Sequence, residues 1–470
     1  MTTKFFELPL ETEHRMKEGE RLFMNGYQSW TYSPEWTGME KLTPFGKKLP
    51  KFLVDMFHLD RYGDYHFIRY ADKPGMYHGF SFCYFRIGEQ YELYASLGED
   101  RGYTVFRYSS MDGKLTAERD LEGLSQEEKE KRIIGDRIFY AEGTMEEVFD
   151  AWFKELGVRP RTTEKLAGYS SWYNRYQNIS ESNVIGDLEG CTRALRKGDL
   201  FQIDDGWETA VGDWLECDSV KFPHGMKYMT DAIHNKGFKA GLWLAPFAAQ
   251  ANSSLVTNHP DWLFKHNESP WVDGCNWGGY YGLDIDNTEV LEYLESTFMK
   301  VFSEWGFDLV KLDFLYAVAP FGTEDETRAE RMGRGMKLLR KLCGDHLILG
   351  CGVPLMPSFG IVDYMRIGCD VGLDWDNTFY MRWINRERVS TKQSLENTVN
   401  RFPLNGRAFL NDPDVFFLRD NNIRLTNDEK KILYTTNASH SGILLCSDNM
   451  SDYTEDKIET YRKVRELFGA

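Results

Sequence analysis

Motifs for metal binding and redox chemistry are missing from this 470-residue sequence. It has no CxxC pair and no HExxH, and its ten histidines never fall at a spacing typical of metal ligands. The eight cysteines stand singly, at positions 83, 191, 217, 275, 343, 351, 369 and 446. Because zinc sites and disulfide frameworks usually show paired cysteines, we expect reduced cysteines, a cytoplasmic location, and neither a metal nor another cofactor.

Signals for a membrane or a nucleic acid are also lacking. The first twenty residues have no apolar core of a signal peptide, and no apolar run reaches the length of a membrane span. The formal net charge is −17, without any cluster of Lys and Arg, so the surface repels phosphate backbones. We expect no nucleic acid and no membrane among the partners.

Aromatic residues, in contrast, are abundant. They make up 15 % of the chain, within an otherwise ordinary composition of 42 % hydrophobic and 27 % charged residues. Aromatic rings stack well on the apolar faces of sugar rings, so this excess is a mild indication of a carbohydrate ligand. The length of the chain predicts two or more domains.

The two parts of the chain show different patterns of apolar and polar residues. Residues 1–160 alternate aromatic and polar residues between glycine-containing turns and end in a helical stretch, which predicts an antiparallel β-sandwich. Residues 161–470 alternate short apolar runs with helical spacing, which predicts a (β/α)8 barrel. The expected barrel strands are 167–173, 200–207, 239–247, 309–316, 347–354, 364–368, 407–414 and 442–449. The segment between the fifth and sixth strands is too short for a full crossover helix.

Unusual polar residues collect at the carboxyl ends of these expected strands, where barrel enzymes build their sites. Those that we select as candidates are Trp172, Asp204, Asp205, Lys311, Asp313, Arg366 and Asp370, together with Trp277 from a glycine-rich loop. Gathering so many charges at one rim costs free energy, and such costs are typical of catalytic sites.

Each feature also has a plainer structural explanation. The stretch 204–207, Asp-Asp-Gly-Trp, is a good turn sequence, and Lys311 with Asp313 could form a structural ion pair. Trp277 could be a surface anchor. The sequence "NDPD" at 411–414 favours a turn or a helix start, and we interpret it as structural. The convergence at one rim favours an active site over these explanations.

Two carboxylates on facing strands suit retaining glycoside hydrolysis. Lys311 beside Asp313 would keep Asp313 ionised, as a nucleophile needs. Asp370, further from a cation and near apolar residues, would keep its proton and act as the acid. Asp204 and Asp205 would accept hydrogen bonds from sugar hydroxyls, with a tryptophan closing the pocket by stacking.

Seven motifs in order resemble glycoside hydrolase family 36, the microbial α-galactosidases. They are "NGYQSWTYSP", "FQIDDGW", "GLWLAPF", "HPDWL", "VKLDF", "CGVPLMPSFGIVDYMRIGCD" and "LNDPD". The resemblance implies that Asp313 is the nucleophile, Asp370 the acid/base, and that Asp204 and Asp205 grip the galactose 4- and 6-hydroxyls. It also implies substrate contacts from Lys311, Arg366, Trp172 and Trp277.

The implied activity is that of a retaining exo-α-galactosidase. It would release terminal α-linked galactose from short oligosaccharides such as melibiose or raffinose, through a covalent galactosyl-Asp intermediate. The alternatives that share the site are an α-N-acetylgalactosaminidase and a raffinose-synthase-like α-galactosyl transferase. From other classes, we considered a sugar-binding protein on an inactive scaffold and a magnesium-dependent barrel enzyme with Asp204, Asp205 and Asp313 as ligands.

Three departures from the family pattern are visible. Ser170 stands where the family usually has Cys, and Cys369 stands where Pro usually precedes the acid/base. The chain ends after the apparent last barrel helix, so we expect it to lack the carboxy-terminal β domain of the family. Barrel surface uncovered in this way could be buried in a homo-oligomer.

Overall fold

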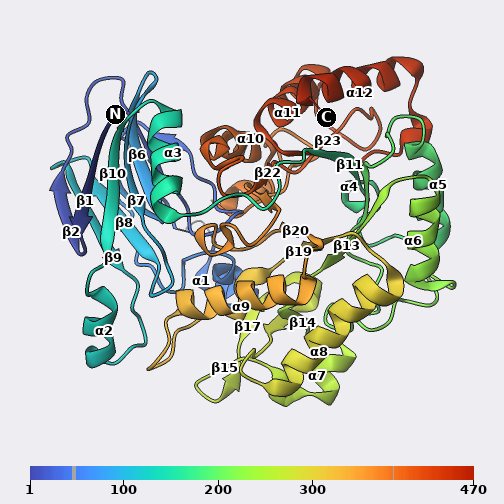
Figure 1. Cartoon of the computed structure of the whole chain (residues 1–470), viewed down its shortest axis with the longest axis horizontal. Coiled ribbons are helices and arrows are strands. Elements are labelled where there is room, and N and C mark those ends of the chain that lie inside the picture. The colour runs from blue at the N-terminus through green and yellow to red at the C-terminus, as the bar shows by residue number, and fades with distance from the viewer. Residues whose placement is uncertain (45–48, 385, 470) are drawn as a thin grey trace.

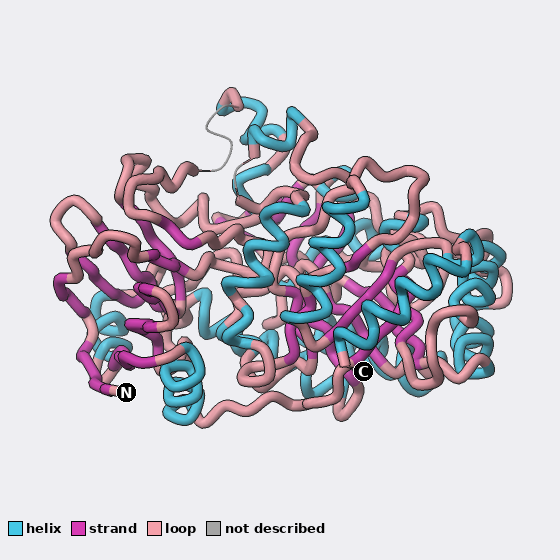
Figure 2. The backbone as a smooth tube through the Cα atoms, turned by 90° about the horizontal axis from the view of Figure 1, so that it is seen from above, coloured by secondary structure: helices cyan, strands magenta, loops and turns pink. Residues whose placement is uncertain are grey.

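The computed structural model describes residues 1–44, 49–384 and 386–469, so Ala470, the end of the expected barrel range, lies outside the described residues. Figure 1 shows two parts side by side: strands from the first third of the chain, in blue to teal, and a larger part of mixed strands and helices, in green to red. Figure 2 shows the same division from above.

Two antiparallel sheets make up most of the amino-terminal part. One has six strands in the order β1, β10, β7, β6, β3, β4, with bounds Thr2–Glu7, Arg137–Gly143, Gln90–Ser96, Phe82–Ile87, Arg21–Met24 and Glu35–Trp36. The other has four strands in the order β2, β9, β8, β5, with bounds Leu10–Glu13, Lys114–Arg119, Thr104–Ser109 and Met76–Phe80.

Apolar side chains on both faces of the six-stranded sheet are buried, because successive residues of a strand point to opposite faces and residues 82–85 of β6 are all apolar. In β6, Phe85 belongs to a core shared with the four-stranded sheet and contacts Tyr108 of β8 at a ring-centroid distance of 5.0 Å. Phe82, which points the other way, contacts Trp152 of helix α3 (Met145–Leu156) at 5.2 Å. Helix α3 covers the second face of this sheet (Figure 1).

Helix α3 agrees with the helical stretch expected at the end of the amino-terminal part. Thr144 and Glu147 form a capping box at its start, which satisfies two backbone N–H groups. Gly157 ends the helix with φ of 66°, a left-handed conformation that glycine adopts at little cost.

A parallel sheet organises the second part of the chain. Its order is β22, β21, β20, β19, β13, β12, β11, β24, β23, so neighbours in space follow the order of the sequence. The bounds from β11 onward are Leu166–Ser170, Leu200–Ile203, Lys239–Leu244, Leu309–Leu312, Leu347–Gly350, Tyr364–Arg366, Leu410–Asp412, Val415–Phe416 and Ile443–Cys446. Every expected barrel strand overlaps one of these, and the strand that it overlaps ends two to four residues earlier than predicted.

The seventh barrel strand closes the ring in two pieces. Its first piece, β22, pairs with β21, and its second piece, β23, pairs with β24. The break falls at Pro413 and Asp414, and Asp414 has φ of 75°. Because β24 also pairs with β11, the strands return to their starting point, as in a (β/α)8 barrel.

Helices cover the outside of this ring (Figure 1). The longer ones are α5 (Glu181–Cys191), α6 (Gly225–Asn235), α8 (Thr288–Met299), α9 (Arg328–Cys343), α10 (Thr391–Asn400), α11 (Asn427–His440) and α12 (Glu455–Phe468). Between β20 and β21 the described chain forms only the single turn η6 (Met356–Ser358), which agrees with the short connection that the sequence predicts. None of the helices in the described ranges combines the length and the apolar stretch that a bilayer crossing demands.

The buried guanidinium of Arg401, just after α10, joins the two parts of the molecule. It donates to Ile367 O of the barrel at 2.9 Å and to four groups of the amino-terminal part. These four are Asn25 Oδ1 (3.0 Å), Ser29 O (2.6 Å), Gln28 O (3.2 Å) and Ser33 Oγ (3.0 Å).

Candidate active site

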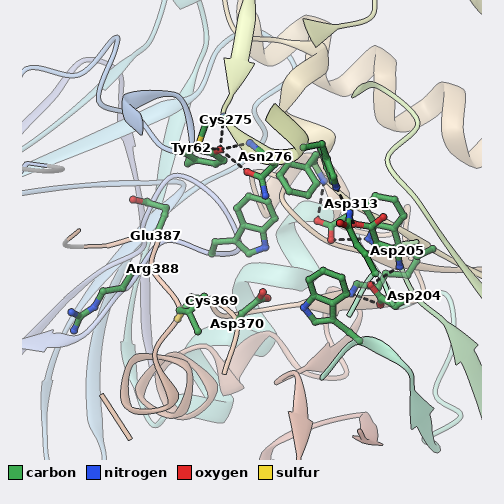
Figure 3. A pocket seen from close by; sticks show the side chains of 18 of the residues that line it. Tyr62, Asp204, Asp205, Cys275, Asn276, Asp313, Cys369, Asp370, Glu387 and Arg388 are labelled. Carbon is green, nitrogen blue, oxygen red and sulfur yellow. Dashed lines mark hydrogen bonds and ion pairs between the residues drawn. The ribbon is translucent and has the colours of Figure 1, made fainter. Parts of the chain in front are cut away.

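A pocket of about 440 Å³ opens at the carboxyl ends of the barrel strands. Seven of the eight predicted site residues line it: Trp172, Asp204, Asp205, Trp277, Lys311, Asp313 and Asp370. Figure 3 shows Asp204, Asp205 and Asp313 on one side of this pocket and Asp370 on the other side. The sequence therefore brings together carboxylates that are up to 166 residues apart, as the positions of Asp204 and Asp370 show.

Asp313 follows directly after strand β19 and is held by its neighbours. Its Oδ1 accepts a hydrogen bond from Phe314 N at 2.9 Å, and its Oδ2 accepts one from Trp243 Nε1 at 3.2 Å. Phe314 has φ of 52°, an uncommon conformation for a residue with a side chain. Both contacts leave the carboxyl group fixed at the pocket wall, where only 7 % of the residue is exposed.

Lys311 makes its ion pair with Asp204, and not with Asp313, the partner that the structural explanation of this stretch suggests. Its Nζ lies 2.9 Å from Asp204 Oδ2, which also accepts a hydrogen bond from Gln202 Nε2 at 2.8 Å. Burial opposes the charge of Lys311, but the nearby carboxylates, first Asp204 and then Asp313, outweigh it and raise the pKa of the ammonium above its ordinary value. Lys311 thus stays charged between the two acids.

Asp205 is fixed by two donors from different loops. Its Oδ2 accepts from Gln177 Nε2 at 2.8 Å and from Trp277 Nε1 at 2.9 Å, while its buried Oδ1 accepts no hydrogen bond within the described chain. Burial, and then the charge of Asp205, raise the pKa of Glu208 well above its usual range. Asp205 thus lies beside a carboxyl group that favours its protonated form, and the contact between the two acids contributes to the raised pKa of Glu208.

Gly206 explains why this stretch is also a turn. Its φ is 114°, and a Cβ there would lie 2.8 Å from the backbone of Gln177. Both features require glycine. The turn explanation and the site explanation of 204–207 are therefore compatible, because the turn brings Asp205 to Gln177.

Asp370 has a cation beside it, which corrects the expectation that it lies further from one. Arg366 Nη1 donates to Asp370 Oδ1 at 2.7 Å. Burial in the barrel mouth raises the pKa of Asp370, while the charges of Arg366 and Lys311 oppose the rise. The net pKa is raised, as expected; of the two reasons that the sequence offered, burial holds and distance from a cation does not.

Arg366 itself lies behind Asp370. The remaining nitrogens of its guanidinium face two further carboxylates, at 3.5 Å from Asp412 Oδ2 and 2.7 Å from Asp414 Oδ1. Asp414 also accepts hydrogen bonds from Tyr173 Oη at 2.5 Å and from Val371 N at 2.8 Å. The "NDPD" stretch, interpreted from sequence as a turn or helix start, instead breaks the seventh strand and turns Asp414 toward Arg366.

Residues from the amino-terminal part complete the pocket, and sequence reasoning did not assign them. Trp30, Leu59 and Tyr62 line it. Trp30 Nε1 contacts Cys351 Sγ at 3.2 Å, so the "QSW" segment reaches the fifth barrel strand. The only signal in the sequence was the motif itself, which indicated a family and not a position.

Tyr62 holds the loop that carries Trp277. Its hydroxyl oxygen accepts from Cys275 N at 2.8 Å and donates to Asn276 Oδ1 at 2.5 Å. Trp277 follows with φ of 54°. Trp277 is thus held through the two residues before it by Tyr62 and through its indole by Asp205, and is not a free surface anchor.

The described residues contain no group of three or more His, Cys, Asp and Glu side chains placed to hold a metal ion. Trp243, Lys311 and Gln177 supply donors to the three carboxylates that the magnesium alternative needs.

Comparison with known proteins gives matches in sequence and in fold. Residues 169–337 match the family model described as Melibiase. The α-galactosidase Mel36A of Lactobacillus acidophilus is 30 % identical over 179 residues, which cover 36 % of this chain and 24 % of that protein. An α-galactosidase of Escherichia coli is 27 % identical over 190 residues, covering 39 % and 25 %. The matched segments thus span about a quarter of the length of these curated relatives.

Solved structures match over the whole chain. The α-galactosidase TtGalA from Thermus thermophilus, in complex with p-nitrophenyl α-D-galactopyranoside, superposes with a TM-score of 0.80 at 26 % identity, covering 100 % of this chain and 92 % of that one. The family 36 α-galactosidase AgaA from Geobacillus stearothermophilus matches in fold, with a TM-score of 0.63 at 13 % identity, covering 97 % and 62 %. These findings confirm the resemblance that the motifs indicate.

Proposed function

We propose that this chain, which resembles the family 36 glycoside hydrolases in sequence and fold, is a retaining exo-α-galactosidase. One observation carries the proposal: Asp313 and Asp370 face each other across one pocket in different environments. Asp313 is held by donors that stabilise a carboxylate, whereas burial raises the pKa of Asp370. A retaining glycosidase needs such a division between a nucleophile and an acid.

In the first step of the proposed mechanism, a carboxylate oxygen of Asp313 attacks the anomeric carbon and forms an ester bond. The glycosidic bond breaks, its electron pair goes to the leaving oxygen, and Asp370 gives that oxygen its proton. In the second step Asp370 takes a proton from water, whose oxygen attacks the anomeric carbon and releases Asp313. Two inversions retain the configuration.

The substrate contacts are assigned from the resemblance to family 36. We assign Asp204 and Asp205 to the 4- and 6-hydroxyls of galactose, as that resemblance implies, and both carboxylates line the pocket wall opposite Asp370. Lys311 donates to a ring hydroxyl, and Trp172 and Trp277 bound the pocket. We assign Arg366 to positioning Asp370, because each of the three nitrogens of its guanidinium lies near a carboxylate oxygen.

The proposed unit of function is the whole described chain. We assign residues 1–160 to a β-sandwich and residues 161–470 to the catalytic barrel, with Trp30 and Tyr62 reaching the site from the first unit. The substrates in this proposal are short oligosaccharides that end in α-linked galactose, a class supported by the Thermus thermophilus α-galactosidase in complex with stachyose.

The test compares initial rates on the 4-nitrophenyl α-glycosides of galactose, N-acetylgalactosamine and glucose. The wild-type chain should turn over the galactoside, and Asp313→Ala should abolish this, while Asp345→Ala, at an exposed position, should not. If only the N-acetylgalactosaminide is hydrolysed, the mechanism stands and the favoured sugar is N-acetylgalactosamine instead of galactose. Transfer of galactose to an added sugar in preference to water would favour the raffinose-synthase-like transferase.

A further inference from the structure

A second cavity adjoins the proposed galactose pocket. It has a volume of about 680 Å³ and shares one lining residue, Val389, with the first pocket. Val389 is 42 % exposed and so lies at an open junction between the two. The proposed galactose pocket has a volume in the usual range for a ligand site, and the second cavity offers comparable space beside it.

The wall between the cavities begins at the proposed acid itself. The chain leaves the barrel at Asp370 and returns at Ser390, whose backbone N donates to Asp370 O at 2.9 Å. Arg388 and Ser390 both donate to Asp376, at 2.8 Å and 3.1 Å. Thr391 Oγ1 donates to Asp374 O at 2.7 Å. The two ends of this excursion from the barrel, near Asp370 and Ser390, are therefore held together by hydrogen bonds beside the proposed acid.

The lining of the second cavity combines an aromatic face with free hydrogen-bond donors. Tyr380, in the turn η7 (Phe379–Trp383), lines it and is 66 % exposed. Arg424 enters from the loop before α11, and its backbone N donates to Leu373 O at 2.7 Å. Within the described ranges neither the Tyr380 hydroxyl nor the Arg424 guanidinium meets a partner. Aromatic faces with a few placed donors are what small polar ligands need.

The charge of the surroundings favours a neutral ligand. The chain carries a net charge of −17, and the second cavity is lined by Asp374 and Asp376 as well as Arg424. Both acids accept hydrogen bonds from the excursion's own residues, so they shape the wall and leave Tyr380 and Arg424 for recognition. Sugar rings have an apolar face for the aromatic ring and hydroxyl oxygens that accept from a guanidinium.

We propose that the second cavity is an outer sugar site, which binds the sugar units beyond the terminal galactose, with Tyr380 as a stacking face and Arg424 as a donor. This inference rests on the proposed function, because it assigns the cavity to the leaving-group side of the same reaction. It predicts that the chain favours longer α-galactosyl oligosaccharides over substrates with a small leaving group.

The first experiment measures kcat/KM for stachyose and for 4-nitrophenyl α-galactoside in the wild type, Tyr380→Ala and Arg424→Ala. The ratio of the stachyose value to the nitrophenyl value should fall about fivefold in each variant, as the loss of one stacking or hydrogen-bond contact worth about 1 kcal/mol requires. Tyr228→Ala, at a 45 % exposed position on α6, is the matched control and should leave the ratio unchanged. An unchanged ratio in both cavity variants overturns the outer site and leaves the α-galactosidase assignment standing.

The second experiment is independent of turnover. Calorimetry would measure the binding of stachyose and of melibiose to Asp313→Asn, with and without Tyr380→Ala. Stachyose should bind more tightly than melibiose, and Tyr380→Ala should remove the difference. If the wild type hydrolyses no galactoside but this binding difference is found, the outer site stands and the proposed reaction falls. Equal binding of the two sugars overturns the outer site.

Discussion

Arg366 Nη1 lies 2.7 Å from Oδ1 of Asp370, four residues further along the chain. The arginine is 3 % exposed at its side chain and the aspartate 38 %, so a buried cation supports a carboxyl group that faces the pocket. Burial raises the pKa of Asp370 and Arg366 lowers it. The pKa of the proposed acid is thus set by two opposing effects, burial in the barrel mouth and the charge of Arg366.

Replacing this arginine should change the pH dependence of catalysis. In Arg366→Gln the lowering effect of the cation is lost, so the pKa of Asp370 should rise further. Because the acid must be protonated, the alkaline limb of kcat/KM should move to higher pH. Leaving the buried Asp412 and Asp414 without their cation should also lower the free energy of unfolding by about 3–5 kcal/mol. A pH–rate profile and urea unfolding measure the two effects, and an alkaline limb that moves to lower pH would contradict the assignment.

Removing the acid should affect poor leaving groups most. In Asp370→Asn, kcat/KM for raffinose should fall by about 10²–10⁴, because its leaving oxygen needs a proton. The nitrophenyl galactoside should lose less in this first step, since nitrophenolate leaves unaided. Added azide should restore its turnover and give a galactosyl azide of retained configuration, whereas Asp313→Ala should give the inverted azide. Chromatography and NMR of the products measure this, and equal losses on both substrates would count against the role of Asp370.

The loop that carries Trp277 offers a test of substrate binding. Tyr62→Phe removes the hydroxyl that contacts Cys275 N and Asn276 Oδ1, so Trp277 should become less well placed. At about 1 kcal/mol of lost binding, KM should rise about fivefold while kcat stays within about twofold. Tyr228→Phe on α6 is the control. A fall in kcat with KM unchanged would place Tyr62 in the chemical step instead.

Glu99 in the amino-terminal part provides a prediction about stability alone. It is 6 % exposed and accepts hydrogen bonds from Thr104 N at 2.9 Å and Ser81 Oγ at 3.1 Å. Burial raises its pKa to about 7. A carboxyl group whose pKa is raised on folding stabilises the fold below its unfolded pKa, and this contribution is lost as the pH rises through 7.

Glu99→Gln should therefore remove this loss of stability at high pH. Its free energy of unfolding should match that of the wild type near pH 4 and exceed it near pH 8, by up to about 3 kcal/mol. Thermal unfolding at the two pH values measures the difference. Glu118→Gln, at a half-exposed position on β9, should show no such change. A variant that is equally less stable at both pH values would mean that Glu99 is ionised in the fold.

The barrel could be predicted because its strands are short apolar runs between helices of regular spacing. The predicted strands end later than the observed ones, because the polar residues that follow each strand, such as Asp204 and Asp205, continue its sequence pattern. Seven candidate residues are indicated by their place at the carboxyl ends of strands and Trp277 by its glycine-rich loop, and seven of these eight share one pocket. Side-chain partners were not predictable: Lys311 sits two residues from Asp313 yet pairs with Asp204, which lies 107 residues away.

Contacts between the two parts of the chain were also beyond the reach of one sequence. Trp30 meets Cys351 across 321 residues, and Tyr62 meets Asn276 across 214. No periodicity or spacing records such pairs. The motif around Trp30 indicated a family, but only the fold shows the ring at the pocket wall.

The single guanidinium of Arg401 has a consequence for how the molecule melts. Its donors are divided between Ile367 of the barrel and four groups of the amino-terminal part, all of them buried. If either part opened alone, the other would lose these charge-assisted hydrogen bonds and expose its interface to water, at a net cost of about 1.5–3 kcal/mol for each bond. The two parts are therefore expected to lose their structure together, in one cooperative transition on heating, as a single folding unit that happens to contain two cores.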